Sequence, residues 1–382
     1  MSELSYLEKL LDGVEVEWVT LGSMADIGTG SSNRQDESEN GIYPFYVRSK
    51  NILKSDTFEF DEVAIVIPGE GGIGDIFHYV EGKYALHQRA YRIRITTNAV
   101  DTKFLYYFMS SSFKQYILTK SVGATSISIR KPMLEGFKVP IPCPDNPEKS
   151  LAIQSEIVRI LDTFTALTAE LTAELTAELN MRKKQYNYYR DQLLSFEEGE
   201  VEWKTLGEVA VIGTGNHDTQ DAIEHGKYIF YARGREPLKL NVFDFDETAI
   251  ITAGDGAGVG KVFHYAKGKY ALHQRAYRIV PNAFMNPRFV YHYITAYFFT
   301  YIQKASVSSS VTSLRRPMFL KFPIPVPPSE EQARIVEILD KFDTLTNSIT
   351  EGLPREIELR QKQYEYYRDL LFSFPKPETV SN

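Results

Sequence analysis

The chain has 382 residues, 43% of them hydrophobic, which is enough for two ordinary domains with buried cores. Its single cysteine, Cys143, excludes a disulfide framework and favours a reducing compartment. The net charge of −7 counts mildly against a nucleic-acid partner, although a local basic face would be enough to bind one. The first residues, MSELSYLEKLLDG, do not form a signal peptide, and no run of about 18 apolar residues predicts a membrane span. These features predict a soluble, cytoplasmic protein.

Most of the chain consists of an internal repeat with two copies. The eleven residues KYALHQRAYRI begin at Lys83 and again at Lys269. Further pairs follow in the same order: VEWVTLG and VEWKTLG, IGTG twice, and RKKQYNYYRDQLLSF at 182–196 with RQKQYEYYRDLLFSF at 360–374. The opening YLEKLLDGVEVEW also resembles the join YRDQLLSFEEGEVEW at 189–203. The repeat predicts two copies of one unit, related as if round a circle, with neighbouring chain ends.

The first predicted domain covers residues 1–147. The segments FDEVAIVIPGEGG and GDIFHYVEGKYALHQRAYRIRI alternate apolar and polar residues, which predicts strands and hairpins, whereas DTKFLYYFMSSSFKQYIL predicts a helix. The predicted fold class is therefore α+β. The string GEGGIG at 69–74 has the letters of a nucleotide-binding loop, but such a loop must open a helix, and a strand is predicted after it. We interpret it as a glycine-rich hairpin loop.

A long helix is predicted over residues 148–198. Ile157, Ile160, Phe164 and Leu167 lie three or four positions apart, as in the seam of a coiled coil. Three TAEL units follow at 168–179 and continue the spacing as a leucine ladder through Leu167, Leu171, Leu175 and Leu179. No Gly or Pro interrupts 148–196. A helix of roughly 65 Å cannot be buried in one small domain, so we interpret it as a spacer.

The second copy repeats this plan with one difference. A second domain is predicted at 199–328, a second long helix at 329–374 and a tail at 375–382. Ser329 is the expected N-cap, with Gln332 completing a capping box, and Ile335, Ile338, Phe342, Leu345 and Ile349 form the expected seam. Gly352 and Pro354 predict a break in this helix. Because Leu161 to Arg182 and Leu339 to Arg360 both span 21 positions, the two helices are expected to lie side by side in matched register.

The motifs of common catalytic sites are absent from the sequence. There is no Walker motif, no HExxH, no cysteine pair for zinc and no motif of a base-modifying methyltransferase. His87 and His273 stand in the duplicated His-Gln-Arg, without a nucleophile beside them. These residues either read DNA bases and phosphates or form a buried polar network, and the sequence leaves both interpretations open.

Better recognition candidates are loops that differ between the copies inside matched frames. GTGSSNRQD stands opposite GTGNHDTQD, YVRSK opposite YARGR, and SVGATSISIRKPM opposite ASVSSSVTSLRRPM. Related but different targets require this pattern, although drift after duplication also produces it. The candidate DNA-contacting residues of the first copy are Arg34, Gln35, Arg48, Lys50, His87, Gln88, Arg89, Thr125, Ser126, Arg130 and Lys131. Those of the second copy are His217, Gln220, Arg233, Arg235, His273, Gln274, Arg275, Ser310, Thr312, Arg315 and Arg316.

Several of these motifs resemble a known family over residues 16–374. RKPMLEGFKVPIPCP, RRPMFLKFPIPVPPSEEQARIVEILD, the TAEL tandem and the helix ends are similar to those of the DNA-specificity subunit of type I restriction-modification systems. The first copy departs from the pattern, because PDNPEKSLAIQ inserts residues between the prolines and Gln154. The loops that would read DNA carry no family motif.

The resemblance implies two similar α/β target-recognition domains with pseudo-twofold symmetry. Each domain would read half of a split, asymmetric site in double-stranded DNA, and two antiparallel helices would set the gap between the halves. Two methyltransferase subunits would bind the helix ends and supply S-adenosylmethionine chemistry, and ATP-dependent restriction subunits with Mg²⁺ could join them. This chain would hold no cofactor or metal, perform no catalysis and bind no membrane. The expected partner-binding residues are Arg182, Lys183, Tyr186, Tyr189, Arg360, Lys362, Tyr364 and Tyr367.

Two alternatives belong to other functional classes. The chain could be a binding scaffold on a coiled coil that does not bind DNA, which the negative charge favours and the basic loops oppose. It could also be an enzyme that uses the glycine loops, which the predicted strands after them oppose.

Overall fold

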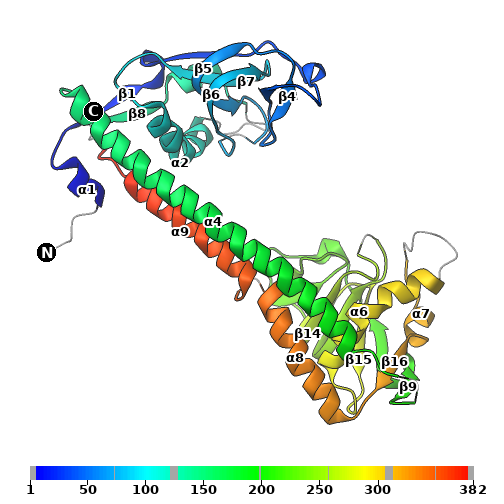
Figure 1. Cartoon of the computed structure of the whole chain (residues 1–382). Helices are drawn as coiled ribbons and strands as arrows, with labels where there is room; N and C mark the ends of the chain where they lie inside the picture. Colours follow the sequence, from blue (N-terminus) through cyan, green and yellow to red (C-terminus); the bar gives the residue numbers. More distant parts are fainter. Residues whose placement is uncertain are drawn as a thin grey trace. The chain divides into compact units, whose positions relative to one another are not determined.

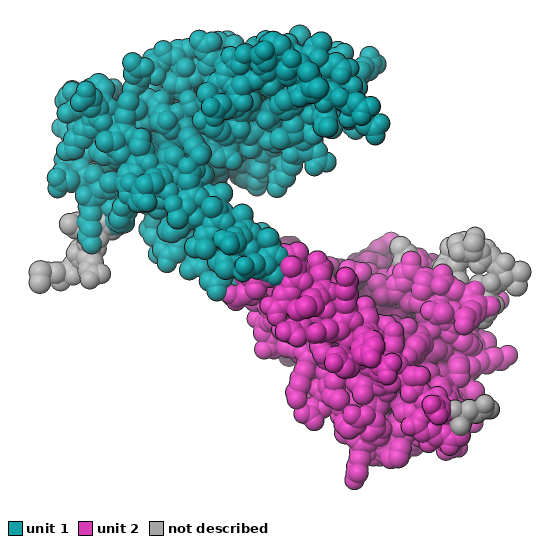
Figure 2. Space-filling model, in the orientation of Figure 1, with its two compact units in different colours: residues 1–174, 357–382 teal, residues 175–356 magenta. Residues whose placement is uncertain are grey.

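The computed structural model describes residues 6–72, 74–120, 128–197, 199–256, 258–305, 313–348 and 350–376 (Figure 1). The chain divides into two compact units, which Figure 2 shows in different colours. Unit 1 is Met1–Glu174 with Ile357–Asn382, and unit 2 is Leu175–Glu356. Each unit therefore takes one part of the long helix α4 (Pro147–Leu193) and one part of α9 (Leu353–Leu371).

The main strands and helices recur in the same order in both units, except that α5 of unit 2 stands where unit 1 has a 3-10 helix (Leu21–Ser23), and α1 precedes the repeated series. The elements of unit 1 before α4 are α1 (Tyr6–Leu11), β1 (Val16–Thr20), β2 (Ala25–Thr29), β3 (Tyr43–Tyr46), β4 (Leu53–Ser55), β5 (Phe60–Pro68), β6 (His78–Leu86), β7 (Ala90–Ile95), α2 (Thr102–Lys120), α3 (Lys131–Glu135) and β8 (Lys138–Pro142). Those of unit 2 after α4 are β9 (Glu202–Thr205), α5 (Leu206–Val209), β10 (Ala210–Thr214), β11 (Tyr228–Tyr231), β12 (Leu238–Leu240), β13 (Phe245–Ala253), β14 (Phe263–Leu272), β15 (Ala276–Pro281), α6 (Pro287–Ala305), α7 (Arg316–Leu320), β16 (Pro323–Val326) and α8 (Ser329–Asn347).

The main sheet has the same topology in both units. Among the described residues it has six strands, in the order β2-β7-β5-β6-β3-β4 in unit 1 and β10-β15-β13-β14-β11-β12 in unit 2. The neighbours pair antiparallel, except that β3 runs parallel to β6 and β11 parallel to β14. The register also repeats, because Phe60 faces Tyr84 and Phe245 faces Tyr270. The predicted α+β repeat is thus confirmed.

One face of each main sheet is covered by a helix of the same domain, α2 in unit 1 and α6 in unit 2. Apolar residues at helical spacing on α2, among them Phe104, Phe108 and Phe113, lie in one core with Ile65 and Ile93 of the sheet. On α6, Phe289 and Phe298 pack in the same way in the core of unit 2. The glycine-rich segment after β5 leads into strand β6 and opens no helix, as the sequence predicted.

A buried glutamine ties each domain to the start of its spacer helix. Gln332 is 1% exposed; its Oε1 accepts a hydrogen bond from Asn286 N at 2.6 Å, and its Nε2 donates to Pro327 O at 2.9 Å. The predicted capping box is wrong, because α8 has Pro328 as its N-cap and Ser329 is already helical. The Gln332 amide satisfies backbone groups of a neighbouring loop instead of the helix N-terminus.

The first copy makes the same contact despite its inserted residues. Gln154 is fully buried, accepts from Asp101 N at 2.8 Å and donates to Ala99 O at 3.0 Å. Eight residues further on, about two helical turns, Asp162 accepts from Lys103 Nζ at 2.8 Å and Tyr107 Oη at 2.6 Å. These contacts join α2 and the loop before it to α4, so the domain of unit 1 is attached to its helix at two points about two turns apart.

The spacer helices have two apolar faces, whereas the sequence predicted one seam. Ile157 and Leu161 are buried in the domain core of unit 1, and Phe164 contacts Tyr367 of α9 with ring centroids 5.7 Å apart. Thr165 Oγ1 donates to Tyr364 Oη at 3.1 Å. Because higher numbers on α4 meet lower numbers on α9, this pair of helices is antiparallel within unit 1, where Figure 1 shows them side by side.

In unit 2, too, some helical side chains pack into the domain core and others contact the opposite helix. Ile335 and Leu339 of α8 are buried in its domain core, while Phe342 lies 5.6 Å from the ring of Tyr189 on α4. The expected break is confirmed, since α8 ends at Asn347, α9 begins at Leu353, and Gly352 has a φ of +86°. Of the predicted seam, Ile349 lies outside the described residues.

The leucine ladder of the TAEL tandem is less buried than predicted at its start. Leu167 is 50% exposed, and Leu171, Leu175 and Leu179 are half-buried. A spacing of four residues advances about 40° beyond a full helical turn at each step, so a strict four-residue ladder drifts off any one face.

The first and last described segments of the chain lie together in unit 1, as the circular repeat predicted. Leu7 and Leu11 of α1 share the core of this unit with Leu371, Phe372 and Phe374. The Trp18 indole Nε1 donates a hydrogen bond to Pro375 O at 2.8 Å. The residues at the end of α9 thereby complete the core of unit 1, as Leu194 at the end of α4 is buried in the core of unit 2.

Candidate nucleic-acid interface

In each sheet the duplicated His-Gln-Arg forms the turn between the two strands that flank one central strand, β5 in unit 1 and β13 in unit 2. In unit 1 it joins β6 to β7, and His87 N donates to Tyr46 O at 3.0 Å. His87 is 7% exposed, and its Nδ1 accepts from Arg89 N at 3.0 Å. Burial, together with the charges of Arg48 and Arg89, lowers the pKa of His87. The ring is therefore neutral at pH 7 and able to accept the hydrogen bond that fixes the backbone of Arg89.

The turn of unit 2 has the same construction. His273 is 1% exposed, its N donates to Tyr231 O at 3.0 Å, and its Nδ1 accepts from Arg275 N at 2.9 Å. Burial again lowers the pKa of this histidine. Each histidine thus supports the turn from inside, and the neighbouring glutamine and arginine are exposed.

Two arginines converge on one carboxylate beside this turn in unit 1. Glu70 Oε2 accepts from Arg48 Nη1 at 3.2 Å and from Arg89 Nη1 at 3.1 Å. The three side chains are 44%, 46% and 57% exposed, respectively. They come from the loop after β3, the loop after β5 and the β6–β7 turn, so three separate segments meet at this charged cluster.

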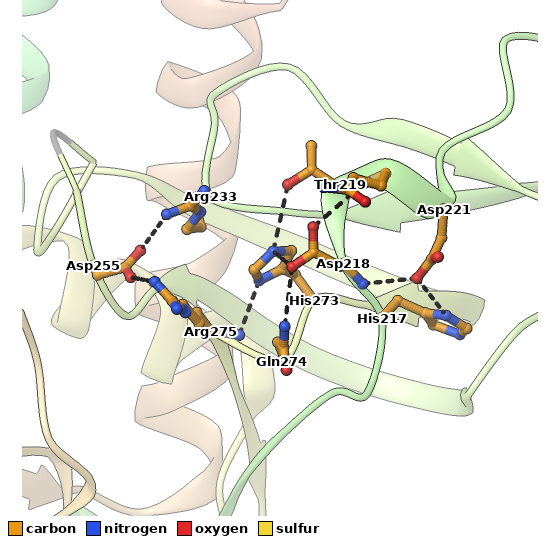
Figure 3. A network of polar contacts seen from close by, with 10 residues as sticks. His217, Asp218, Thr219, Asp221, Arg233, Asp255, His273, Gln274 and Arg275 are labelled. Atoms are coloured by element: carbon orange, nitrogen blue, oxygen red, sulfur yellow. Dashed lines mark hydrogen bonds and ion pairs between the residues drawn. The ribbon is translucent and has the colours of Figure 1, made fainter.

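The same cluster recurs in unit 2, and Figure 3 shows it at close range. Asp255 Oδ1 accepts from Arg233 Nη1 at 3.0 Å, and Oδ2 accepts from Arg275 Nη1 at 3.1 Å. Burial of Asp255 would raise its pKa, but the hydrogen bonds from Arg233 and Arg275 outweigh burial and lower it. This carboxylate is therefore ionised at neutral pH and is a permanent counter-ion for both guanidinium groups.

The glutamine of each turn contacts one of the loops that differ between the copies. Gln88 Nε2 donates to Asn33 Oδ1 at 2.5 Å, and Gln274 Nε2 donates to Asp218 Oδ2 at 3.0 Å (Figure 3). Asn33 and Asp218 occupy the same place in the two copies of this loop. A constant turn is thus joined to a variable loop in both units.

A second exchange between the copies keeps one polar contact with different residues. In unit 1 Ser32 Oγ donates to Glu59, whereas in unit 2 His217 Nε2 lies 3.1 Å from Asp244 Oδ1. His217 also lies 3.5 Å from Asp221 Oδ2. The scaffold therefore accepts a change of surface chemistry at matched positions.

Two glycines allow the variable loop to approach the turn. A Cβ added to Gly30 would lie 1.8 Å from Leu86 O, and one added to Gly215 would lie 1.8 Å from Leu272 O. Both distances are far below contact, and the obstacle is backbone. This close approach explains why the motif IGTG is kept in both copies.

Substitution of either glycine is expected to destabilise its own unit. Gly30→Ala and Gly215→Ala should each lower the free energy of unfolding by about 3 kcal/mol, because the backbone must move to admit the methyl group. Urea denaturation with tryptophan fluorescence would measure this loss, with Trp18 reporting on unit 1 and Trp203 on unit 2. Gly28→Ala is the control, since its Cβ would meet only the Arg92 side chain, at 3.8 Å. Equal stability of the Gly30 and Gly28 variants would contradict the steric explanation.

The remaining DNA-binding candidates are exposed or lie outside the described residues. Arg34, Gln35, Lys50, Gln220, Arg235 and Arg315 are exposed, as are Arg130, Lys131 and Arg316 next to helices α3 and α7. Arg34 Nε lies 3.9 Å from Glu37 and Lys131 Nζ lies 3.9 Å from Glu135. Thr125, Ser126, Ser310 and Thr312 fall outside the described residues.

The surface around Asp255 is hollowed on two sides. One cavity of about 450 Å³ is lined by Arg233, Arg235 and Asp255, with glycines of the loop after β13. A second cavity of about 280 Å³ is lined by Asp255, Gln274 and Arg275, with Ser313 at its edge. Asp255 borders both cavities, so both lie beside the arginine cluster.

Sequence reasoning missed the carboxylates at the centre of these clusters. Glu70 and Asp255 lie 22 positions after Arg48 and Arg233, and they occupy matched places in PGEGG and AGDGAG. An acidic residue at the same place in both copies was the signal for them in the sequence. Asn33 and Asp218 also stand at one matched place, and the sequence analysis missed them as well.

The predicted partner-binding residues lie on the helices and are partly engaged there. Tyr186 packs near Phe342, and burial raises its pKa to about 12. Arg182 contacts Glu178 at 3.2 Å, Lys362 contacts Glu358 at 2.6 Å, and Lys183 is exposed. Arg360 Nη1 donates to Gln363 Oε1 at 3.1 Å.

The most exposed aromatic residues on these helices were not among those predicted. Tyr188 and Tyr366 are each 62% exposed and contact the neighbouring Tyr189 and Tyr367. The doublet Tyr-Tyr-Arg, present in both copies, was the signal for them. In unit 1 an apolar cavity of about 520 Å³ between α1, α4 and α9 lies next to this doublet and is lined by Leu7, Ile160, Phe164, Tyr367, Leu370 and others.

The described part of the chain has neither a membrane-spanning helix nor a metal-binding cluster. None of its helices is both long and apolar enough to cross a bilayer. No group of three or more His, Cys, Asp or Glu side chains there is placed to hold a metal ion.

The whole chain is similar in sequence to specificity subunits of restriction enzymes. The family model described as the type I restriction modification DNA specificity domain matches twice, at residues 13–181 and 198–359. The chain is 41% identical to the specificity subunit of the type I restriction enzyme EcoR124I/EcoR124II of Escherichia coli, over 100% of both chains. It is 38% identical to the EcoprrI specificity subunit of the same species, over 92% of this chain and 93% of the relative.

Solved structures share the fold at lower identity. The S subunit of the type I restriction-modification system of M. genitalium has a TM-score of 0.52 and 18% identity, covering 96% of this chain and 98% of that one. A chain from a structure titled for the assembly and conformational transition of the type I R-M system has a TM-score of 0.61 and 14% identity, covering 94% and 97%. The chain therefore belongs to the type I restriction-modification DNA specificity family, as a recognition subunit and not as an enzyme.

Proposed function

We propose that each unit of this specificity subunit reads one half of a split, asymmetric site in double-stranded DNA. The observation that carries the proposal is the recurrence, in both units, of one constant turn with two arginines and a carboxylate beside a loop that differs between the copies. Arginine is the commonest reader of guanine in the major groove, and glutamine of adenine. The constant turn would read what the two half-sites have in common, and the loop residues that differ would read what distinguishes them.

Within this surface we assign different roles to the predicted residues. Arg48, Arg89, Arg233 and Arg275 face solvent and are the candidates for contacts with bases. His87 and His273 are buried, so we assign them to holding the turn. The exposed basic residues next to α3 and α7, Arg130, Lys131, Arg315 and Arg316, suit phosphate contacts, which position the protein without reading sequence.

We propose that the helices carry the partners and fix the spacing of the half-sites. Two methyltransferase subunits would bind the exposed Tyr-Tyr-Arg doublets and the apolar cavity beside Tyr367. The methyl donor S-adenosylmethionine, and ATP with Mg²⁺ on restriction subunits where these join, would belong to the partners, and the assembly would work in the cytoplasm. The binding scaffold without DNA and the glycine-loop enzyme are both set aside by membership of a DNA-specificity family.

Mapping of methylated sites tests this function directly. The chain and its methyltransferase partner are expressed together in a host without other methylation, and all modified positions in the genome are read. A single two-part motif with a fixed gap is expected. A continuous motif, or methylation without sequence preference, would contradict two separate readers.

The chain alone is expected to bind DNA weakly. With a net charge of −7 and small basic surfaces, its contact with phosphates is limited, and its Kd on random duplexes should exceed about 1 µM at 0.15 M salt. Fluorescence anisotropy with and without the methyltransferase subunit, over a series of salt concentrations, measures this. Tight and selective binding by the isolated chain at physiological salt would overturn the expectation.

A further inference from the structure

The carboxylate at the centre of each arginine cluster has no role in the recognition described so far. DNA is an anion, so a carboxylate on its binding surface opposes binding unless it serves some other purpose. Both units nevertheless have one at the same place, as Glu70 in unit 1 and as Asp255 in unit 2. The two residues differ in length but make the same pair of contacts, which indicates that the charge and its position matter.

The backbone that holds each carboxylate is fixed from two sides. Gly69 N donates to Arg89 O at 2.9 Å, and Ile129 N donates to Gly69 O at 2.8 Å. In unit 2, Gly254 N donates to Arg275 O at 2.8 Å and Leu314 N to Gly254 O at 2.7 Å. A Cβ on Gly254 would lie 2.6 Å from Arg275 O, so this contact between the loop and the turn admits only glycine. The carboxylate therefore has a defined position relative to the turn arginine.

The contacts leave much of each guanidinium available. Arg48, Arg89, Arg233 and Arg275 all meet the carboxylate through Nη1. A guanidinium carries five N–H donors, and guanine is read by two of them. A phosphate, by contrast, would compete for the place between the two arginines that the carboxylate already occupies. The arrangement thus admits a base edge more readily than a backbone phosphate.

We propose, resting on the DNA-reading function above, that Glu70 and Asp255 are specificity-determining positioning residues. Each holds two arginines in place for base contact and, as an internal counter-ion, lowers the affinity of its unit for non-cognate DNA. With the carboxylate the cluster has a net charge of +1, and without it the charge is +2. The lowered pKa of Asp255 keeps this counter-ion charged at neutral pH.

The test compares Glu70→Gln and Asp255→Asn with the wild-type complex of this chain and its methyltransferase partner. If the freed arginines make one additional phosphate contact, the slope of log affinity against log salt concentration steepens by about 0.9. The ratio of variant to wild-type affinity for random duplex should then be about 8 times larger at 0.1 M than at 1 M salt. Affinity for the cognate site should rise less or fall. The base preference should broaden in the half-site of the altered unit and remain unchanged in the other.

Matched controls separate this effect from a general change of charge. Asp61→Asn and Asp246→Asn remove one exposed carboxylate at equivalent positions in the two units; Asp61 stands about 23 Å from Pro68, at the other end of β5. Glu70→Asp should behave as wild type, because unit 2 uses aspartate at this place. In a chain that also carries Arg48→Ala and Arg89→Ala, Glu70→Gln should have no effect on random DNA, since the freed arginines are absent.

The possible outcomes lead to distinct conclusions. If Glu70→Gln matches Asp61→Asn in both random-DNA affinity and base preference, the proposal is wrong. An unchanged effect in the arginine-free background would also refute it, because the carboxylate would then act on something other than the arginines. If the wild-type complex shows no sequence preference at all, the reading function itself fails, and that result is visible before any variant is made.

Discussion

Insertion of one TAEL unit into α4 is expected to lengthen the non-specific gap of the recognised site by one to two base pairs, with both half-sites unchanged. Four helical residues add about 6 Å, and B-DNA rises about 3.4 Å per base pair. The division between the two units falls at residues 174 and 175, inside the tandem at 168–179. An insertion there leaves the internal contacts of both units intact, which is why the half-sites should persist.

Two features limit the gain in length. The opposite helices are not extended, so strain must be absorbed, and the break between Asn347 and Leu353 is the place for it. Four residues also turn the helix about 40° beyond a full turn, so affinity should fall somewhat. Methylome mapping of insertion and deletion variants decides the matter. Glu170→Ala and Glu174→Ala alter the tandem without changing its length, and these variants should keep the original gap. An unchanged gap after insertion would show that something else fixes the spacing.

Removal of one cluster arginine is expected to relax only the half-site of its own unit. Arg48→Ala should affect one half and Arg233→Ala the other, each lowering discrimination at one or more positions by roughly 5- to 150-fold, because a good base contact contributes about 1–3 kcal/mol. Since both units keep His-Gln-Arg, the two half-sites should share at least one base. Methylation mapping of each variant measures both expectations.

The control for charge uses a second matched pair of residues. Lys83→Ala and Lys269→Ala each remove one cation at equivalent positions on β6 and β14, where both lysines lie over a phenylalanine ring. These variants should weaken binding little and leave the motif unchanged. Loss of discrimination in both halves after a single arginine substitution would contradict independent readers.

Periodic features of the fold could be predicted from the sequence. Alternation of apolar residues gave the strands, the uninterrupted run over 148–196 gave α4, and Gly352 with Pro354 gave the break before α9. These features depend on neighbours a few residues apart, for which the local pattern is sufficient. Because the sequence repeats, each secondary-structure prediction for one unit also applied to the matching residues of the other.

Contacts between distant segments could not be predicted in the same way. The pattern around Gln332 fits a capping box, but its amide reaches a loop 46 residues away, because the domain folds back onto its helix. For His87 the sequence left a DNA-reading residue and a buried polar residue equally open, and the fold buries it. Arg48 and Glu70 meet across 22 residues for the same reason. Such pairings follow from the sheet order, which the sequence pattern does not specify.

The placement of Leu371, Phe372 and Phe374 in the core of unit 1 sets the order in which the nascent chain folds. Unit 2 is continuous from Leu175 to Glu356, so all of its residues are synthesised before the last core residues of unit 1. Domains generally fold during synthesis in the order of the chain, but here the N-terminal unit completes its core last. Until Phe372 and Phe374 emerge, Phe104 and Phe108 lack the aromatic rings that cover them. The segment that completes unit 1 also carries its Tyr-Tyr-Arg motif, so a chain that stops before residue 366 would lack both the last part of this core and one of the two docking sites that we propose for the methyltransferase.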